Sequence, residues 1–175
     1  MMRIFLIGYM GAGKTTIGKS LARRMNLNYI DTDHYIEARY RKKVGDIFVS
    51  EGEERFRQLE HRILLEVSEF ENIVISTGGG LPCFHDNMTL MNNRGITAYL
   101  EIPEEELAKR LEMSKNVRPV LKGRTGGELI EFVREHLNER RQFYEQSKIR
   151  LYAGQMDTNN DIESLSRKLE TLICR

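Results

Sequence analysis

Short runs of apolar residues alternate along this chain with stretches in which apolar residues recur every three or four positions. The runs are short enough to be buried strands, and each is followed by a stretch with helical spacing. Strands and helices that alternate in this way predict βαβ units and a parallel sheet, so we expect an α/β fold. The predicted strands are residues 4–7, 28–30, 73–76, 96–101 and 148–152.

Three segments depart from this alternation. Two helical stretches, 34–41 and 46–70, precede the third strand, which is more helix than one crossover needs. We therefore expect an insert at about 33–60 that covers a substrate. Residues 114–127 are polar, basic and glycine-bearing, and a loop of this length between two helices is typical of a mobile lid. Residues 154–161 predict a turn before a closing helix.

The segment 104–113 predicts a helix whose charges are explained by electrostatics alone. A proline precedes it, acidic residues fill its first turn, and Lys109 and Arg110 follow later. This order suits the helix dipole, so these two basic residues need no function to explain them.

Composition narrows the class of protein. The length of 175 residues predicts one domain spanning 1–175, and the formal charge of +1 arises from interspersed acids and bases. This excludes the basic stripe of a nucleic-acid binder and a polybasic membrane anchor, and no run approaches the roughly 18 apolar residues of a membrane span.

Cys83 and Cys174 lie far apart without metal-ligand spacing, so we expect inert thiols. The chain begins without the layout of a signal peptide, and we expect a cytoplasmic protein.

The strongest motif is GYMGAGKTT at residues 8–16, which follows the first predicted strand and opens a helical stretch. It matches the phosphate-loop pattern G-x-x-x-x-G-K-[ST], and this context disfavours the alternative of a chance glycine-rich turn. Loop amides and the helix dipole are expected to bind the phosphates of a nucleoside triphosphate. Lys14 would reach the β- and γ-phosphates and Thr15 would bind Mg²⁺. The predicted nucleotide-binding residues are Gly11, Ala12, Gly13, Lys14, Thr15 and Thr16.

Two aspartates follow the second predicted strand. In an extended segment, Asp31 and Asp33 point to the same side, at the carboxyl end of a strand beside the phosphate loop. One would hold a water of the Mg²⁺ shell, and the other would orient or deprotonate an acceptor hydroxyl. The alternative is that Asp33 caps the helix at 34–41, which explains one aspartate and leaves the pair unexplained.

Two arginines are candidates for binding an anionic substrate. Arg57 lies at helical spacing between Glu53 and Glu60, which would fix its fork for a carboxylate, although an exposed salt-bridge ladder has the same spacing. Arg140 interrupts an apolar stripe and needs an anionic partner, either a substrate or a structural ion pair. The spacing leaves both choices open.

Two further segments are candidates for ligand contact. Three glycines at 78–80 follow the third predicted strand, where backbone without side chains approaches a ligand closely. In the expected lid, Arg118 stands before a proline, which suits an arginine that closes over phosphates. Other basic residues of the lid remain alternatives, namely Lys115, Lys122 and Arg124.

Taken in order, these motifs resemble those of the shikimate kinases over nearly the whole chain. They are G-x-x-G-x-G-K-T-T at 8–16, D-T-D at 31–33, I-F-x-x-x-G-E-x-x-F-R-x-x-E at 47–60, G-G-G at 78–80, R-P at 118–119 and R-x-x-x-Y at 140–144. Only the first is specific by itself, but the ordered set is highly specific.

The resemblance implies a three-layer α/β/α P-loop kinase with a nucleoside-monophosphate-kinase-like fold and a five-stranded parallel sheet of order 2-3-1-4-5. It implies transfer of the γ-phosphate of ATP to the 3-hydroxyl of shikimate, giving shikimate 3-phosphate and ADP on the chorismate route to aromatic amino acids. The implied cofactor is Mg²⁺. The implied partners are ATP and shikimate, and we expect a monomer with no nucleic-acid or membrane partner.

The resemblance also implies a role for each matched residue. On the acceptor side, Asp33 contacts the reacting hydroxyl, Gly79 touches the substrate through its backbone, and the shikimate carboxylate is held by Arg57 and Arg140. On the donor side, the loop at 8–16 binds ATP with help from the lid arginine Arg118. Thr15 binds Mg²⁺ directly and Asp31 lies in its outer shell. The implied catalytic residues are Lys14, Asp33 and Arg118.

Two features depart from the family pattern. Gln142 stands where the family often has proline, and residues 151–161 align only loosely with the family's adenine loop, where Gln155 and Asn159 are candidates. Rival functions are another small-metabolite kinase, such as a gluconate or nucleoside-monophosphate kinase, and a regulator that binds ATP without turnover. Two arginines beside the aspartate pair favour a carboxylate-bearing polyol, and the intact set of charges favours an active enzyme.

Overall fold

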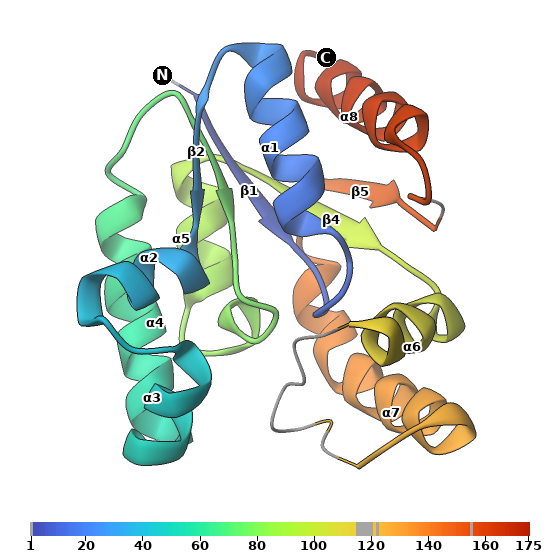
Figure 1. Cartoon of the computed structure of the whole chain (residues 1–175). Coiled ribbons are helices and arrows are strands. Elements are labelled where there is room, and N and C mark those ends of the chain that lie inside the picture. Colours follow the sequence, from blue (N-terminus) through green and yellow to red (C-terminus); the bar gives the residue numbers. More distant parts are fainter. Residues whose placement is uncertain (1, 115–120, 122, 155) are drawn as a thin grey trace.

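A computed structural model describes residues 2–114, 121, 123–154 and 156–175 (Figure 1). Half of the predicted lid at 114–127, namely residues 115–120 and 122, lies outside this part of the chain. Arg118, the basic alternatives Lys115 and Lys122, and the adenine candidate Gln155 are among the residues that are not described.

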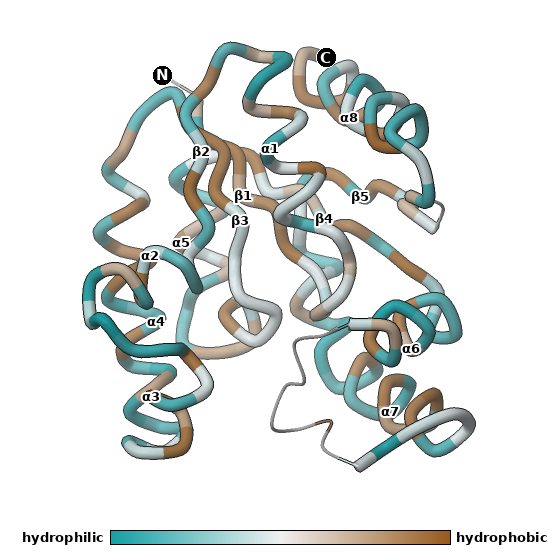
Figure 2. Tube along the Cα trace, in the orientation of Figure 1, coloured by the Kyte–Doolittle hydropathy of each residue, from teal (hydrophilic) through white to brown (hydrophobic). Residues whose placement is uncertain are grey.

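The core is a five-stranded parallel sheet in the order β2-β3-β1-β4-β5, as expected. The central strand pairs with one neighbour on each side, so that Phe5 lies opposite Ile75 and Thr97. Its apolar side chains from Ile4 to Ile7 are fully buried, and Figure 2 shows hydrophobic residues gathered along the central strands. The strands are β1 (Arg3–Ile7), β2 (Asn28–Asp31), β3 (Ile73–Ser76), β4 (Ile96–Glu101) and β5 (Ile149–Tyr152).

Helices cover both faces of the sheet, which confirms the three-layer α/β/α fold (Figure 1). Helix α1 packs against α8 on one face, and α5 lies on the other, against β4. The helices are α1 (Lys14–Met25), α2 (Thr32–Tyr40), α3 (Val44–Glu51), α4 (Glu53–Val67), α5 (Asn87–Arg94), α6 (Glu104–Met113), α7 (Gly126–Tyr144) and α8 (Asn159–Ile173), with a 3-10 turn η1 (Leu81–Cys83). No helix in the described ranges is both long and apolar enough to cross a lipid bilayer.

The insert before β3 differs from its prediction in two places. The expected helix at 46–70 is two helices, α3 and α4, because Gly52 between them has φ 81° and ψ 165°. That conformation belongs to glycine and ends the helical hydrogen bonding.

The other difference lies at the start of α2. The side chain of Asp31 caps this helix by accepting from the amides of Asp33, at 3.0 Å, and His34, at 3.4 Å. The alternative that Asp33 provides the cap is therefore wrong, since Asp33 lies within the first turn. The extended geometry assumed for both aspartates is also wrong beyond Asp31, where β2 ends.

Candidate active site

The carboxyl ends of β1, β2 and β3 meet at one edge of the sheet, and a cavity of about 500 Å³ opens there. Its walls come from segments far apart in sequence: the phosphate loop, the β2–α2 junction, the glycines after β3 and the C-terminal end of α6. The carboxyl edge of a parallel sheet is where open α/β proteins bind ligands. The cavity brings together Lys14, Thr15, Thr16, Asp31, Asp33 and Gly79.

The phosphate loop is shaped by glycines with positive φ, at 79° for Gly11 and 85° for Gly13. Gly13 caps α1, and the first turn of that helix holds no acidic residue, so its positive dipole end is open to an anion. Lys14 is 8% exposed, and its Nζ donates to the carbonyls of Gly8 and Tyr9 at 2.8 Å each. The lysine is thus held beneath the loop whose amides would face the phosphates.

Thr15 and Asp31 are joined by a hydrogen bond in which the threonine hydroxyl donates to the carboxylate at 2.8 Å. A hydroxyl and a carboxylate are oxygen ligands of the kind that Mg²⁺ prefers, and both line the cavity. No cluster of three His, Cys, Asp or Glu that could hold a metal occurs among the described residues. The two residues therefore fit a Mg²⁺ ion that Thr15 would contact together with nucleotide phosphates, while Asp31 would lie in the outer shell of the ion.

Asp33 approaches the glycine turn from the first turn of α2. A Cβ added to Gly78 would lie 2.7 Å from Oδ1 of Asp33 and 2.9 Å from Oε1 of Glu60. Two carboxyl groups therefore converge at Gly78, and no larger residue leaves room for them. The amide of Gly78 donates to the hydroxyl of Thr32 at 3.0 Å, which ties the turn to α2.

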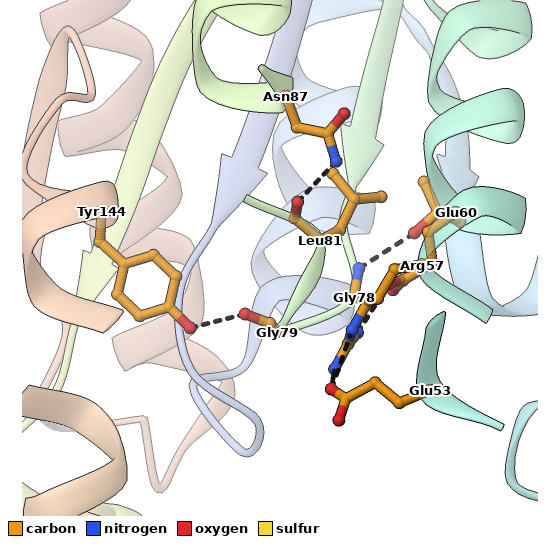
Figure 3. A network of polar contacts seen from close by, with 9 residues as sticks. Glu53, Arg57, Glu60, Gly78, Gly79, Leu81, Asn87 and Tyr144 are labelled. Carbon is orange, nitrogen blue, oxygen red and sulfur yellow. Dashed lines mark hydrogen bonds and ion pairs between the residues drawn. The ribbon is translucent and has the colours of Figure 1, made fainter. Parts of the chain in front are cut away.

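Arg57 is a largely buried cation on α4, and its side chain is oriented by two ion pairs (Figure 3). It donates to Glu60 at 2.7 Å and to Glu53 at 3.0 and 3.3 Å, and its side chain is only 11% exposed. The guanidinium also lies 4.2 Å from the ring centroid of Phe84. The salt-bridge ladder is therefore present, but it is exposed only at Glu53, whose side chain is 55% exposed. Gly80 belongs to the same packing, because a Cβ there would lie 2.5 Å from Nη1 of Arg57.

Glu60, the ion-pair partner of Arg57, is the most deeply buried charge of this region, with a side chain 3% exposed. Burial raises the pKa of Glu60 to about 7, against the opposing effect of Arg57. Asp33 adds to the rise and Arg140 opposes it. The pKa of the Glu60 carboxyl is therefore affected by charged groups on α2, α4 and α7.

Arg140 faces the same region from α7. Its guanidinium carbon lies 5.7 Å from the ring centroid of Tyr9, and no carboxylate within the described part of the chain forms an ion pair with it. Its charge acts on Glu60 and on Cys83, as that of Arg57 does. The structure thus brings both predicted arginines close to Glu60, and among the residues it describes the second has no structural ion pair.

Tyr144, one turn after Arg140, fixes the glycine turn from the other side (Figure 3). Its buried hydroxyl donates to the carbonyl of Gly79 at 2.6 Å. A Cβ on Gly79 would lie 3.1 Å from the amide nitrogen of Met10. Gly79 is therefore held between α7 and the phosphate loop, with its backbone exposed to the cavity.

Several residues of the site carried no recognisable sequence signal. Arg110, explained above by the helix dipole alone, in fact lines the cavity, and its buried Nη1 has no hydrogen-bond partner among the residues that the structure describes. It also lines an adjoining cavity of about 390 Å³, together with Met156 and Asp157. Asn159 begins α8 and is not among the residues that line either cavity.

His136 and Cys83 are the other unexpected neighbours. His136 Nδ1 lies 2.8 Å from the hydroxyl of Tyr9, and burial lowers the pKa of the imidazole to about 4, helped by Arg140 and Arg57. Cys83 was expected to be inert, and burial raises the pKa of its thiol to about 11. The thiol is therefore uncharged beside the two arginines.

Comparison with known proteins gives a consistent result. The family model described as shikimate kinase matches residues 10–171. The shikimate kinase of Parabacteroides distasonis is 53% identical over 173 residues, covering 99% of this chain and all of that protein. The shikimate kinase of Bacteroides thetaiotaomicron, solved by crystallography, superposes with a TM-score of 0.96 at 47% identity and covers 99% of both chains.

More distant structures show how far the likeness extends. A shikimate kinase from Acinetobacter baumannii in complex with shikimate has a TM-score of 0.86 at 32% identity, over 99% of this chain and 93% of that one. A gluconokinase from Sinorhizobium meliloti, at 16% identity and a TM-score of 0.52, shares the fold alone. With a family model over most of its length and relatives near half identity, the chain belongs to the shikimate kinase family.

Proposed function

We propose that this protein transfers the γ-phosphate of ATP to the 3-hydroxyl of shikimate, giving shikimate 3-phosphate and ADP on the route to chorismate. The observation that carries the proposal is the convergence of Arg57, Arg140 and Asp33 around Glu60, beside the glycine turn that lines the cavity of the phosphate loop. Two cations that approach one region from different helices suit a carboxylate, and the neighbouring aspartate suits a hydroxyl on the same molecule.

On the donor side, the amides of the phosphate loop and the N-terminus of α1 bind the phosphates. Lys14 leaves its two carbonyl partners, or shares them, to contact the β- and γ-phosphates. Thr15 binds Mg²⁺ directly and Asp31 holds a water of its shell, an arrangement that the existing hydrogen bond between them supports. When bound, the metal neutralises charge on the phosphates. Arg118, outside the described residues, is the proposed lid arginine over ATP.

On the acceptor side, Arg57 arrives already oriented by Glu53 and Glu60, so little side-chain entropy is lost when it binds a carboxylate. Arg140 supplies the second contact, and the backbone of Gly79 lines the substrate. Asp33 orients the hydroxyl for in-line attack and takes up its proton. Positioning and charge neutralisation provide most of the acceleration in this chemistry.

We further propose that residues 1–175 act as one kinase domain and as a monomer. A hydrophobic cluster that runs from β1 to α8 supports the single domain. Action in the cytoplasm fits ATP as the donor and the two cysteines, Cys83 and Cys174, which lie within the described residues as free thiols.

A coupled ADP-release assay with shikimate, quinate and gluconate as acceptors tests the proposal. We expect release that depends on shikimate and on Mg²⁺, with a Lys14→Met variant as the control for contaminating ATPases. Preferential turnover of gluconate would favour a different small-metabolite kinase. ATP binding without acceptor-dependent turnover would favour a nucleotide-gated regulator and contradict the proposal.

A further inference from the structure

Tyr9, the second residue of the phosphate loop, contacts both halves of the site. Its carbonyl accepts from Nζ of Lys14 at 2.8 Å, while its ring lies beneath the guanidinium of Arg140, with 5.7 Å between the guanidinium carbon and the ring centroid. The residue is 1% exposed, so its ring has little room to adopt another orientation. One residue thus supports the donor lysine through its backbone and the acceptor arginine through its ring.

The hydroxyl of Tyr9 is held by His136, one helical turn before Arg140 on α7. Tyr9 Oη and His136 Nδ1 lie 2.8 Å apart, and the two rings meet edge to face with centroids 5.6 Å apart. Phe132 also packs against the imidazole, with 5.2 Å between ring centroids. The imidazole therefore contacts both an aromatic ring and a phenol, and these contacts restrict its orientation.

His136 is suited to this contact because it is neutral near pH 7. Burial lowers the pKa of its imidazole to about 4, and the positive charges of Arg140 and Arg57 act in the same direction. A neutral ring shares a proton with the phenol without placing a third cation beside the two arginines. The pair thus avoids the repulsion that a lysine or a protonated histidine would introduce here.

The face of Tyr9 matters to Arg140 because that guanidinium has no ion-pair partner in the part of the chain that the structure describes. A cation over an aromatic face is attracted by the ring quadrupole, and the attraction depends on how the ring is oriented. Without the hydrogen bond to His136, the orientation of the Tyr9 ring is less tightly fixed, and the cation–π contact with the Arg140 guanidinium is weakened. The acceptor carboxylate would then have to order Arg140 as it binds.

We propose that His136 is a positioning residue for the acceptor site: it holds the hydroxyl of Tyr9 so that the ring keeps Arg140 oriented toward the substrate carboxylate. This inference rests on the proposed role of Arg140. It assigns His136 no contact with either substrate, and it makes the Tyr9–His136 hydrogen bond a determinant of acceptor affinity.

The test compares variants that remove the hydrogen bond from each side. His136→Phe keeps an aromatic ring, His136→Asn keeps a polar atom near the position of Nδ1, and Tyr9→Phe removes only the hydroxyl. Initial rates are measured with shikimate and ATP varied in turn, and shikimate binding is measured by calorimetry. Glu135→Gln, an exposed neighbour on α7, is the matched control and is expected to match the wild type.

We expect His136→Phe and Tyr9→Phe each to raise KM for shikimate roughly threefold to thirtyfold, the range of a partly desolvated cation–π contact, with KM for ATP unchanged. The double variant should be no worse than either single one, and His136→Asn should recover much of the loss. An unchanged KM for shikimate, an equal rise for both substrates, or additive effects in the double variant would each overturn the proposal.

An Arg140→Ala variant separates this inference from the proposed function. If Arg140→Ala raises KM for shikimate but His136→Phe does not, only the positioning role fails. If neither variant affects KM for shikimate, the assignment of Arg140 to the acceptor carboxylate fails, and the positioning role fails with it.

Discussion

Replacing Arg57 with methionine should affect stability and substrate binding by different mechanisms, and the two can be measured separately. Methionine keeps much of the apolar stem but leaves Glu60, 3% exposed, without its cation. Removing one member of a buried ion pair typically costs about 3–5 kcal/mol. We expect a loss of this size in the free energy of unfolding of Arg57→Met at pH 8.5.

The loss should shrink at lower pH because Glu60 is able to take up a proton. Its pKa is about 7 with Arg57 present, and removing Arg57, the largest influence that lowers it, moves the pKa higher. Above pH 7 the native variant then binds a proton that the native wild type does not, so the penalty falls by up to about 1.4 kcal/mol for each pH unit. Between pH 8.5 and pH 7 this amounts to about 2 kcal/mol, and below pH 7 the difference levels off.

Urea unfolding at pH 8.5 and pH 6 measures this effect, and the Glu60→Gln background provides the control. In that background Arg57→Met should have a smaller effect that does not change with pH, because no buried carboxylate is left unpaired. Both Arg57→Met proteins should nevertheless bind shikimate roughly tenfold to a hundredfold more weakly, since a hydrogen bond to a charged group contributes about 1.5–3 kcal/mol. Equal penalties at the two pH values, or restored shikimate affinity in the double variant, would refute the reasoning.

Three further substitutions test other parts of the site. Asp33→Asn should lower kcat about a hundredfold to ten-thousandfold while ATP binds normally by calorimetry, and near-normal turnover would contradict its role. Thr15→Val should raise the Mg²⁺ concentration needed for half-maximal rate whereas Thr15→Ser should not, and an equal response of both variants would remove Thr15 from the metal site. Tyr144→Phe should lower the free energy of unfolding by about 1–3 kcal/mol, because the carbonyl of Gly79 loses its buried hydrogen bond. Urea midpoints indistinguishable from the wild type would show that another group satisfies that carbonyl.

The fold was predictable because its signals are local. Each strand is a short apolar run, and the phosphate loop depends on consecutive residues between a strand and a helix. The break at Gly52 was missed because a glycine within a helical pattern is often tolerated. The spacing of the apolar residues does not reveal the backbone conformation that ends α3. At the start of α2, only Asp33 was considered as a cap, but Asp31 provides it because β2 ends there.

The site was only partly predictable, because several of its properties arise from contacts between distant residues. Spacing placed Glu53 and Glu60 beside Arg57, but burial of the cluster depends on the approach of Phe84 and of the glycine turn. The contact between Tyr9 and His136 joins residues 127 positions apart. A single histidine on a helix carries no pattern that points to such a partner.

The three glycines after β3 have a consequence for how the two substrates influence each other. A side chain at Gly79 would meet the amide of Met10 at 3.1 Å, and one at Gly78 would meet the carboxylates of Asp33 and Glu60. The proposed ATP and shikimate sides are thus separated at Gly78 and Gly79 by main chain alone. A displacement of the phosphate loop on nucleotide binding would therefore move atoms that directly contact the proposed acceptor wall. Thermodynamic linkage then requires that nucleotide and shikimate change each other's affinity by the same factor, so the two sites form one binding unit.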